Sequence, residues 1–222
     1  MGQEVSPAWE RLHSIIKKHA RTISIGVLII AVAGGGFLWN RSHRASLRNR
    51  AAMALREGVG LFYASRQAEN PDFQMAIASL SGVTESYPGT GAAGQAALYL
   101  GHIYYAKGNY PAALERYQKA VSELTSESPF MEVALFNVAY ALEAKREFAN
   151  ARAAYKQVLD LPRGVLKDRA VIGIGRCYEA QGDLKAASQT YKSILKRFPN
   201  SPWVQELRQR MDMLQAKKPK AQ

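Results

Sequence analysis

Hydrophobic positions divide this chain of 222 residues into two parts. Residues 22–40 are uncharged and mostly apolar, and they lie between Arg21 and Arg41. From residue 50 to residue 214, apolar side chains recur instead at intervals of three and four residues, the spacing that lines one face of an α-helix. No stretch of useful length alternates between apolar and polar residues as a half-buried strand would. The pattern therefore predicts an all-α protein with one unusually apolar segment near its start.

The apolar segment 22–40 has the length and composition of a single transmembrane helix. Its 19 residues would extend about 28 Å as a helix, close to the hydrocarbon thickness of a bilayer. Trp39 lies where an aromatic side chain would meet the membrane interface. Ala31-Val32-Ala33 also has the form of a signal-peptide cleavage site, so release after residue 33 is the alternative. We favour a retained helix, because apolar residues resume at Phe37 and Leu38 beyond that site.

The segments at the two ends of the chain are basic. Residues 1–50 carry a net charge of +6 and the tail 217–222 carries +3, out of +12 for the whole chain. This distribution suits phospholipid headgroups better than a nucleic-acid backbone, so we expect no nucleic-acid partner. Four cations precede the span and four follow it, which leaves its orientation undecided. Residues 1–21 are predicted to be a basic N-terminal segment, with a surface-bound amphipathic helix over 6–20 and a mobile leader as equal alternatives.

A motif repeats four times between residues 50 and 200. Each copy places a small residue in a first helix, then a small and a large residue in a second helix. The large residues recur at spacings of 37, 38 and 36, and they are Leu80, Tyr117, Tyr155 and Tyr191. Small residues allow two helices to approach closely, and large ones fill the space that remains. The residues assigned to this packing are Gly60, Gly101, Ala113, Tyr117, Ala151, Tyr155, Gly175, Ala187 and Tyr191.

This pattern resembles the tetratricopeptide repeat, whose consensus places W-x2-L-G-x2-Y before A-x3-F and a final proline. Leu100-Gly101-x-x-Tyr104 and Ile174-Gly175-x-x-Tyr178 carry the resemblance, although no unit has the tryptophan. The resemblance implies a solenoid of about four helical hairpins within a domain that covers residues 41–216. The predicted units are 50–90, 91–129, 130–166 and 167–200, followed by a capping helix over 202–216.

The first helices of successive units line the concave face in proteins built of such repeats, and the resemblance implies that positions two, five, nine and twelve point into it. The positions carried over are Gln95, Leu98, His102 and Tyr105 in unit two, Val133, Phe136, Tyr140 and Glu143 in unit three, and Arg169, Ile172, Arg176 and Glu179 in unit four. Such a groove suits an extended peptide or a helix with apolar side chains and an acidic group. For Leu98, Phe136 and Ile172, a place in the core is an equally good interpretation.

The sequence offers no recognisable catalytic or metal-binding constellation. Gly173-Ile174-Gly175 lacks the third glycine and the preceding strand of a dinucleotide-binding loop. Cys177 is a single cysteine, which excludes an internal disulfide, and the four histidines are not spaced as metal ligands. We therefore expect a binding protein without a cofactor, a metal or an enzymatic activity.

The order of parts, a basic leader followed by one span and about four repeats, resembles the YfgM-like family of bacterial inner-membrane proteins, which are ancillary subunits of the Sec translocon. This resemblance implies a single-pass protein of the inner membrane, with its N-terminus in the cytoplasm and its repeats in the periplasm. It also implies contacts with the SecYEG channel, with a periplasmic chaperone of the isomerase type, and with nascent secreted chains. An adaptor for envelope assembly or cell division, released by cleavage after Ala33, is the alternative.

Overall fold

The computed structural model describes residues 7–216, and every regular element in that range is a helix. The prediction of an all-α protein is therefore confirmed for the described residues. Within this range, side chains are not described at residues 7–16, 19–23, 25–31 and 215. The predicted amphipathic stripe over 6–20 lies largely outside the described side chains, and the predicted basic tail 217–222 lies outside the described residues.

The chain consists of two compact parts, and the boundary between them follows Asn49. The first helix, α1 (Pro7–Gln67), crosses this boundary. In the N-terminal part, the described apolar side chains Val32, Phe37, Leu38 and Trp39 are between 65% and 71% exposed. No helix has a stretch long and apolar enough to cross a membrane among the residues that could be searched. Positions 22, 23 and 25–31 of the predicted span fall outside the described side chains.

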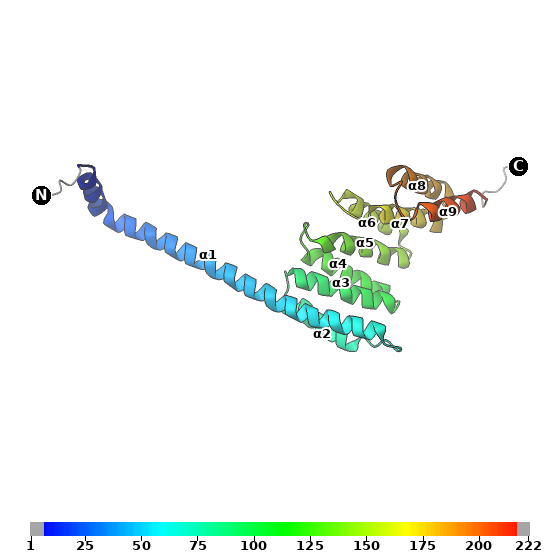
Figure 1. Cartoon of the computed structure of the whole chain (residues 1–222), viewed down its shortest axis with the longest axis horizontal. Helices are drawn as coiled ribbons and strands as arrows, with labels where there is room; N and C mark the ends of the chain where they lie inside the picture. Colours follow the sequence, from blue (N-terminus) through cyan, green and yellow to red (C-terminus); the bar gives the residue numbers. More distant parts are fainter. Residues whose placement is uncertain (1–6, 217–222) are drawn as a thin grey trace. The chain divides into compact units, whose positions relative to one another are not determined.

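Residues 50–216 form a row of helical hairpins, which we call the repeat domain (Figure 1). Each helix packs mainly on its neighbours in the sequence, and the first helices α3, α5 and α7 of successive hairpins also touch. This row of hairpins is a solenoid, so the predicted repeat architecture is confirmed. The helices that follow α1 are α2 (Gln74–Ser86), α3 (Gly91–Ala106), α4 (Tyr110–Glu123), α5 (Pro129–Ala144), α6 (Phe148–Asp160), α7 (Lys167–Ala180), α8 (Leu184–Arg197) and α9 (Val204–Ala216).

The three hairpin turns after α3, α5 and α7 share one backbone geometry. Each has a residue with positive φ, namely Gly108 at 72°, Arg146 at 63° and Gly182 at 81°. Glycine adopts this left-handed conformation without steric cost, whereas Arg146 holds it against the usual preference of a side-chain-bearing residue. In two of these turns, a side chain caps the helix that follows. Asn109 and Asp183 each accept a hydrogen bond from a backbone N–H in the first turn of α4 and α8, respectively.

In the second and fourth hairpins, a large side chain of the second helix packs against a glycine of the first helix. A Cβ atom added to Gly101 would collide with the ring of Tyr117, and one added to Gly175 would collide with the ring of Tyr191. Tyr155 is the corresponding residue of the third hairpin, and it is fully buried. The predicted alanines of the second helices, Ala113, Ala151 and Ala187, are also fully buried.

The prediction that Gly60 makes the close helix–helix contact of the first hairpin is wrong. A Cβ atom on Gly60 would meet nothing within 4 Å, whereas one on Gly58 would lie 2.7 Å from Leu80. Gly58 belongs to a buried stripe of α1 that includes Leu55 and Phe62. The connection between α1 and α2 has six residues, against three in the later hairpins, so the repeat register cannot be carried across it. Two residues of helix correspond to a rotation of about 200°, which places Gly60 on the opposite face.

Helix α9 covers the end of the solenoid. Its Leu207, Met211 and Leu214 are buried against a cluster that includes Tyr191 and Ile194 of α8. Trp203, which lies within the range predicted for the capping helix, precedes α9 and is 37% exposed. It lies instead beside the first helix of the last hairpin, where it contributes to the site described next.

Candidate functional site

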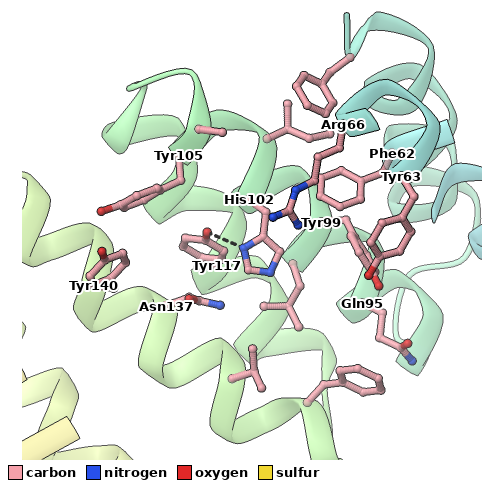
Figure 2. A pocket seen from close by; sticks show the side chains of 16 residues that line it. Phe62, Tyr63, Arg66, Gln95, Tyr99, His102, Tyr105, Tyr117, Asn137 and Tyr140 are labelled. Carbon is pink, nitrogen blue, oxygen red and sulfur yellow. Dashed lines mark hydrogen bonds between the residues drawn. The ribbon is translucent and has the colours of Figure 1, made fainter. Parts of the chain in front are cut away.

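A cavity of about 510 Å³, the aromatic pocket, is enclosed mainly by α1, α3 and α5 of the repeat domain (Figure 2). Most of its wall is apolar and aromatic, as in typical ligand sites. The aromatic side chains that line it are Phe62, Tyr63, Phe73, Tyr99, Tyr105, Tyr117, Phe130 and Tyr140. The rings contact one another in two groups: Phe62 lies edge-on to Tyr99 at 5.1 Å between centroids, and Tyr105 stacks on Tyr140 at 5.0 Å.

A small polar group sits within this aromatic wall. His102 Nδ1 lies 3.0 Å from the hydroxyl oxygen of Tyr117, and the two side chains are hydrogen-bonded (Figure 2). Burial, and then the positive charge of Arg66, lower the pKa of His102 below its usual value of 6.5. The imidazole is therefore neutral at pH 7. Burial also raises the pKa of Tyr117, so its hydroxyl keeps its proton.

Asn137 of α5 supplies a hydrogen-bond donor that the protein does not use. Its Nδ2 atom is buried and has no hydrogen-bond partner within the described part of the chain. Asn137 lines the aromatic pocket on the side that faces His102 (Figure 2). A buried amide without a partner costs about 1–3 kcal/mol, and an acceptor on a bound molecule would remove that cost.

A second, smaller pocket of about 120 Å³, the arginine pocket, shares Tyr140 with the aromatic pocket. The two pockets therefore adjoin at Tyr140, and we refer to them together as the groove and to Tyr140 as the ridge between them. Tyr140 is 39% exposed and carries the Arg176 guanidinium at 5.8 Å from its ring centroid. The residues that line the arginine pocket are Phe136, Tyr140, Arg169, Ile172, Arg176, Trp203 and Glu206.

Most of the residues predicted from the repeat pattern line this groove. Those in the aromatic pocket are Gln95, Leu98, His102, Tyr105, Val133 and Tyr140. Those in the arginine pocket are Phe136, Tyr140, Arg169, Ile172 and Arg176. Leu98 and Phe136 are only 3% and 7% exposed, so each is at once a core residue and part of a pocket wall, whereas Ile172 is half-buried.

The prediction that Glu143 and Glu179 point into the groove is corrected by the structure, because neither lines the aromatic pocket or the arginine pocket. Glu143 accepts hydrogen bonds from Arg176 Nε and Nη2, both at 2.7 Å, and from the Tyr155 hydroxyl at 2.6 Å. Glu179 binds Arg210 Nε at 2.8 Å and the Tyr191 hydroxyl at 3.1 Å in the same way. Each acid thus ties its own hairpin to the next element, and Glu143 neutralises Arg176.

Several pocket residues were not found from the sequence. Tyr99 and Asn137 each follow a predicted groove residue by one position, so a wider helical face would have included them. Arg66 and Tyr63 belong to the first hairpin, for which the repeat pattern predicted no groove residues. Trp203 enters from the segment before α9, and no repeat pattern covers that segment.

Comparisons with known proteins agree with this architecture. Two family models of the tetratricopeptide repeat match the chain, one over residues 64–129 and the other over residues 142–211. A TPR repeat-containing protein of Treponema pallidum (strain Nichols) is 29% identical to it over 101 residues, which are 46% of this chain and 42% of that relative. The matched region thus spans less than half the length of the relative. The matches support tetratricopeptide repeats in general, and they do not distinguish the YfgM-like family.

Proposed function

We propose that this tetratricopeptide repeat protein is an interaction scaffold that binds an extended polypeptide segment along the groove formed by its aromatic and arginine pockets. Tetratricopeptide repeats as a class are non-enzymatic modules for protein–protein interaction, and they are present here. The observation that carries the proposal is the aromatic pocket, which combines apolar walls with the unpaired amide donor of Asn137.

An extended polypeptide satisfies both properties of the aromatic pocket. Its apolar side chains gain about 25 cal/mol for each Å² that the rings remove from water. Its main-chain carbonyls are acceptors at every residue, so Asn137 can donate to one of them whatever the local sequence. A groove of this kind recognises a class of segments rather than one sequence.

We also propose that residues 22–40 anchor the protein in a bacterial inner membrane, beside the Sec translocon. The support is the uncharged sequence of this segment and the high exposure of Phe37, Leu38 and Trp39. Three consecutive helical residues point in three directions, so lipid on all sides accounts for their apolar character better than one protein partner would. An anchor of this kind would hold the groove near the channel exit and raise its effective concentration for emerging chains.

Site-specific photocrosslinking in cells tests the groove. A photoreactive amino acid replaces Tyr140 at the ridge, and a matched variant carries it at Lys156, which is exposed on α6 and lines neither pocket. We expect crosslinks to translocon subunits or secreted chains from position 140 and not from position 156. Equal crosslinking from both positions would overturn the groove as the binding site, and crosslinks only to cytosolic proteins would overturn the proposed topology.

Fractionation of the full chain tests the anchor separately. We expect the protein to stay in the membrane fraction after alkaline carbonate washing and to keep the 24.5 kDa mass of the full sequence. A mature protein that lacks residues 1–33 and leaves the membrane fraction would support the released adaptor instead.

A further inference from the structure

One guanidinium of the arginine pocket, that of Arg169, lies over aromatic rings and has no acidic partner among the described residues. Arg169 is exposed at the first turn of α7, with its guanidinium carbon 5.1 Å from the ring centroid of Phe136 and 6.0 Å from that of Trp203. No carboxylate of the described residues lies within ion-pair distance of it. A guanidinium that lies over aromatic faces keeps its N–H edge available for a planar acceptor.

The other charged groups nearby do not complete the site. Arg176 lines the pocket but is bound by both oxygens of Glu143. Glu206 lines the opposite wall without forming an ion pair to Arg169 among the described contacts. Asp168 faces a different cavity, where it accepts a hydrogen bond from the Ser201 hydroxyl at 2.5 Å. Arg169 is therefore the cation of the pocket that remains open to a ligand.

We propose that the arginine pocket binds the side-chain carboxylate of an aspartate or glutamate in the same segment whose apolar side chain occupies the aromatic pocket. This inference rests on the proposed function and narrows its partner class. The carboxylate would pair with the Arg169 guanidinium through two parallel N–H···O bonds. Because only the Tyr140 ridge separates the two pockets, the recognised feature is a bulky apolar residue and an acidic residue a few positions apart.

The size of the pocket favours a side chain over a chain terminus. A volume of about 120 Å³ admits one acidic side chain. A C-terminal carboxylate would have to bring the last side chain of the partner into the same small space. We therefore commit to an internal acidic residue, and the experiment includes a terminal carboxylate as a competing source.

Fluorescence anisotropy with the full-length protein in detergent tests the inference. The probes are labelled, C-terminally amidated Gly/Ser peptides with one Phe and one Asp placed two, three or four residues apart in either order, and the matching peptides with Asn. We expect at least one Asp peptide to bind about tenfold more tightly than its Asn counterpart at low salt. Arg169→Gln should reduce this ratio to about one, and Glu206→Gln should increase it.

The control is Lys185→Gln, which removes one exposed positive charge of α8 outside both pockets. It should keep the wild-type preference for Asp. An equal affinity for Asp and Asn peptides in the wild type would overturn the carboxylate site while leaving the peptide groove intact. Tightest binding by an Asn peptide with a free C-terminus would also overturn it, in favour of a terminal carboxylate. No binding of any probe, together with no crosslinks from position 140, would overturn the proposed function itself.

Discussion

Tyr117 is both a core residue and part of the wall of the aromatic pocket. Its ring closes the second hairpin against Gly101, and its hydroxyl is hydrogen-bonded to His102 in the wall of the aromatic pocket. Only 2% of its surface is exposed, so the ring is held by its neighbours on every side except the one that borders the aromatic pocket. The shape of the pocket therefore depends on the absence of a side chain at one position of α3.

Substitution of Gly101 tests this dependence. Gly101→Ala should destabilise the repeat domain by about 1–3 kcal/mol, because the new methyl group collides with the Tyr117 ring and forces it to shift from its packed position. Gly60→Ala is the matched control within another helix, where a Cβ meets nothing within 4 Å. It should stabilise the protein by about 0.5–1 kcal/mol through helix propensity. Urea unfolding followed by circular dichroism measures both, and equal effects would contradict the assigned contact.

His102 gives the stability of the domain a dependence on pH. Its pKa is lower in the folded protein than its usual value of 6.5, so the unfolded chain binds the proton more readily. Its contribution to the free energy of unfolding is fully present above pH 6.5 and is lost as the pH falls below that value. We expect His102→Gln to flatten the decline in melting temperature between about pH 7.5 and 5, where histidine titrates. The exposed His43 is the control, and a flattening of the same size in His43→Gln would contradict this assignment.

At the scale of the element, helices are joined by two different kinds of contact. Glu143 ties the third hairpin to Arg176 of α7, and Glu179 ties the fourth to Arg210 of α9. Between the second and third hairpins, the groove-side contact is the stacking of Tyr105 on Tyr140, which adds to the apolar core that these hairpins share. The capping helix α9 is thus held by an ion pair in addition to its buried apolar face.

The apolar face of α9 should carry most of its stabilising effect. Leu207 is 1% exposed, so Leu207→Ala should cost about 2–4 kcal/mol by leaving a cavity against α8. Met213 lies on the same helix and is 57% exposed, so Met213→Ala should change the free energy of unfolding by less than about 0.5 kcal/mol. Thermal unfolding of the two variants compares them directly. Similar losses from both would mean that α9 does not pack on the solenoid through Leu207.

The helices of the later hairpins were largely predictable, because residues that recur at a constant spacing show which positions of successive hairpins correspond. Ala113, Ala151 and Ala187 recur at nearly constant spacing, and each is fully buried. The prediction for Gly60 was wrong because nothing in the sequence shows how many residues connect α1 to α2. The groove faces of α3 and α5 follow from helical periodicity. The unpaired state of Asn137 and the partner of Glu143 depend on how three helices meet, which no single-helix pattern contains.

At the scale of the whole repeat domain, stability is distributed along one dimension. Among the described residues, each hairpin contacts its neighbours and not the distant hairpins. The free energy of such a stack is approximately a sum of the stabilities of its units and of the interfaces between them. A local defect should therefore open the nearest end of the stack before the remainder.

Hydrogen exchange can detect this directional response. Gly175→Ala forces a methyl group against the Tyr191 ring in the last hairpin. We expect faster amide exchange in α7, α8 and α9, with little change in α2 and α3 at the other end of the repeat domain. Mass spectrometry of the exchanged peptides gives the pattern. Uniform acceleration from α2 to α9 would indicate a single cooperative unit instead.

The change from an ion-paired joint to an aromatic one along the groove has a mechanical consequence. A carboxylate held at both oxygens by one guanidinium resists rotation, whereas stacked rings slide over each other at little cost. We therefore expect the joint at Glu143 and Arg176 to resist displacement more than the joint at Tyr105 and Tyr140 does. In the proposed groove, a wider bound segment would therefore be accommodated by displacement at Tyr105 and Tyr140, while the distance between α5 and Arg169 of α7 stays nearly constant.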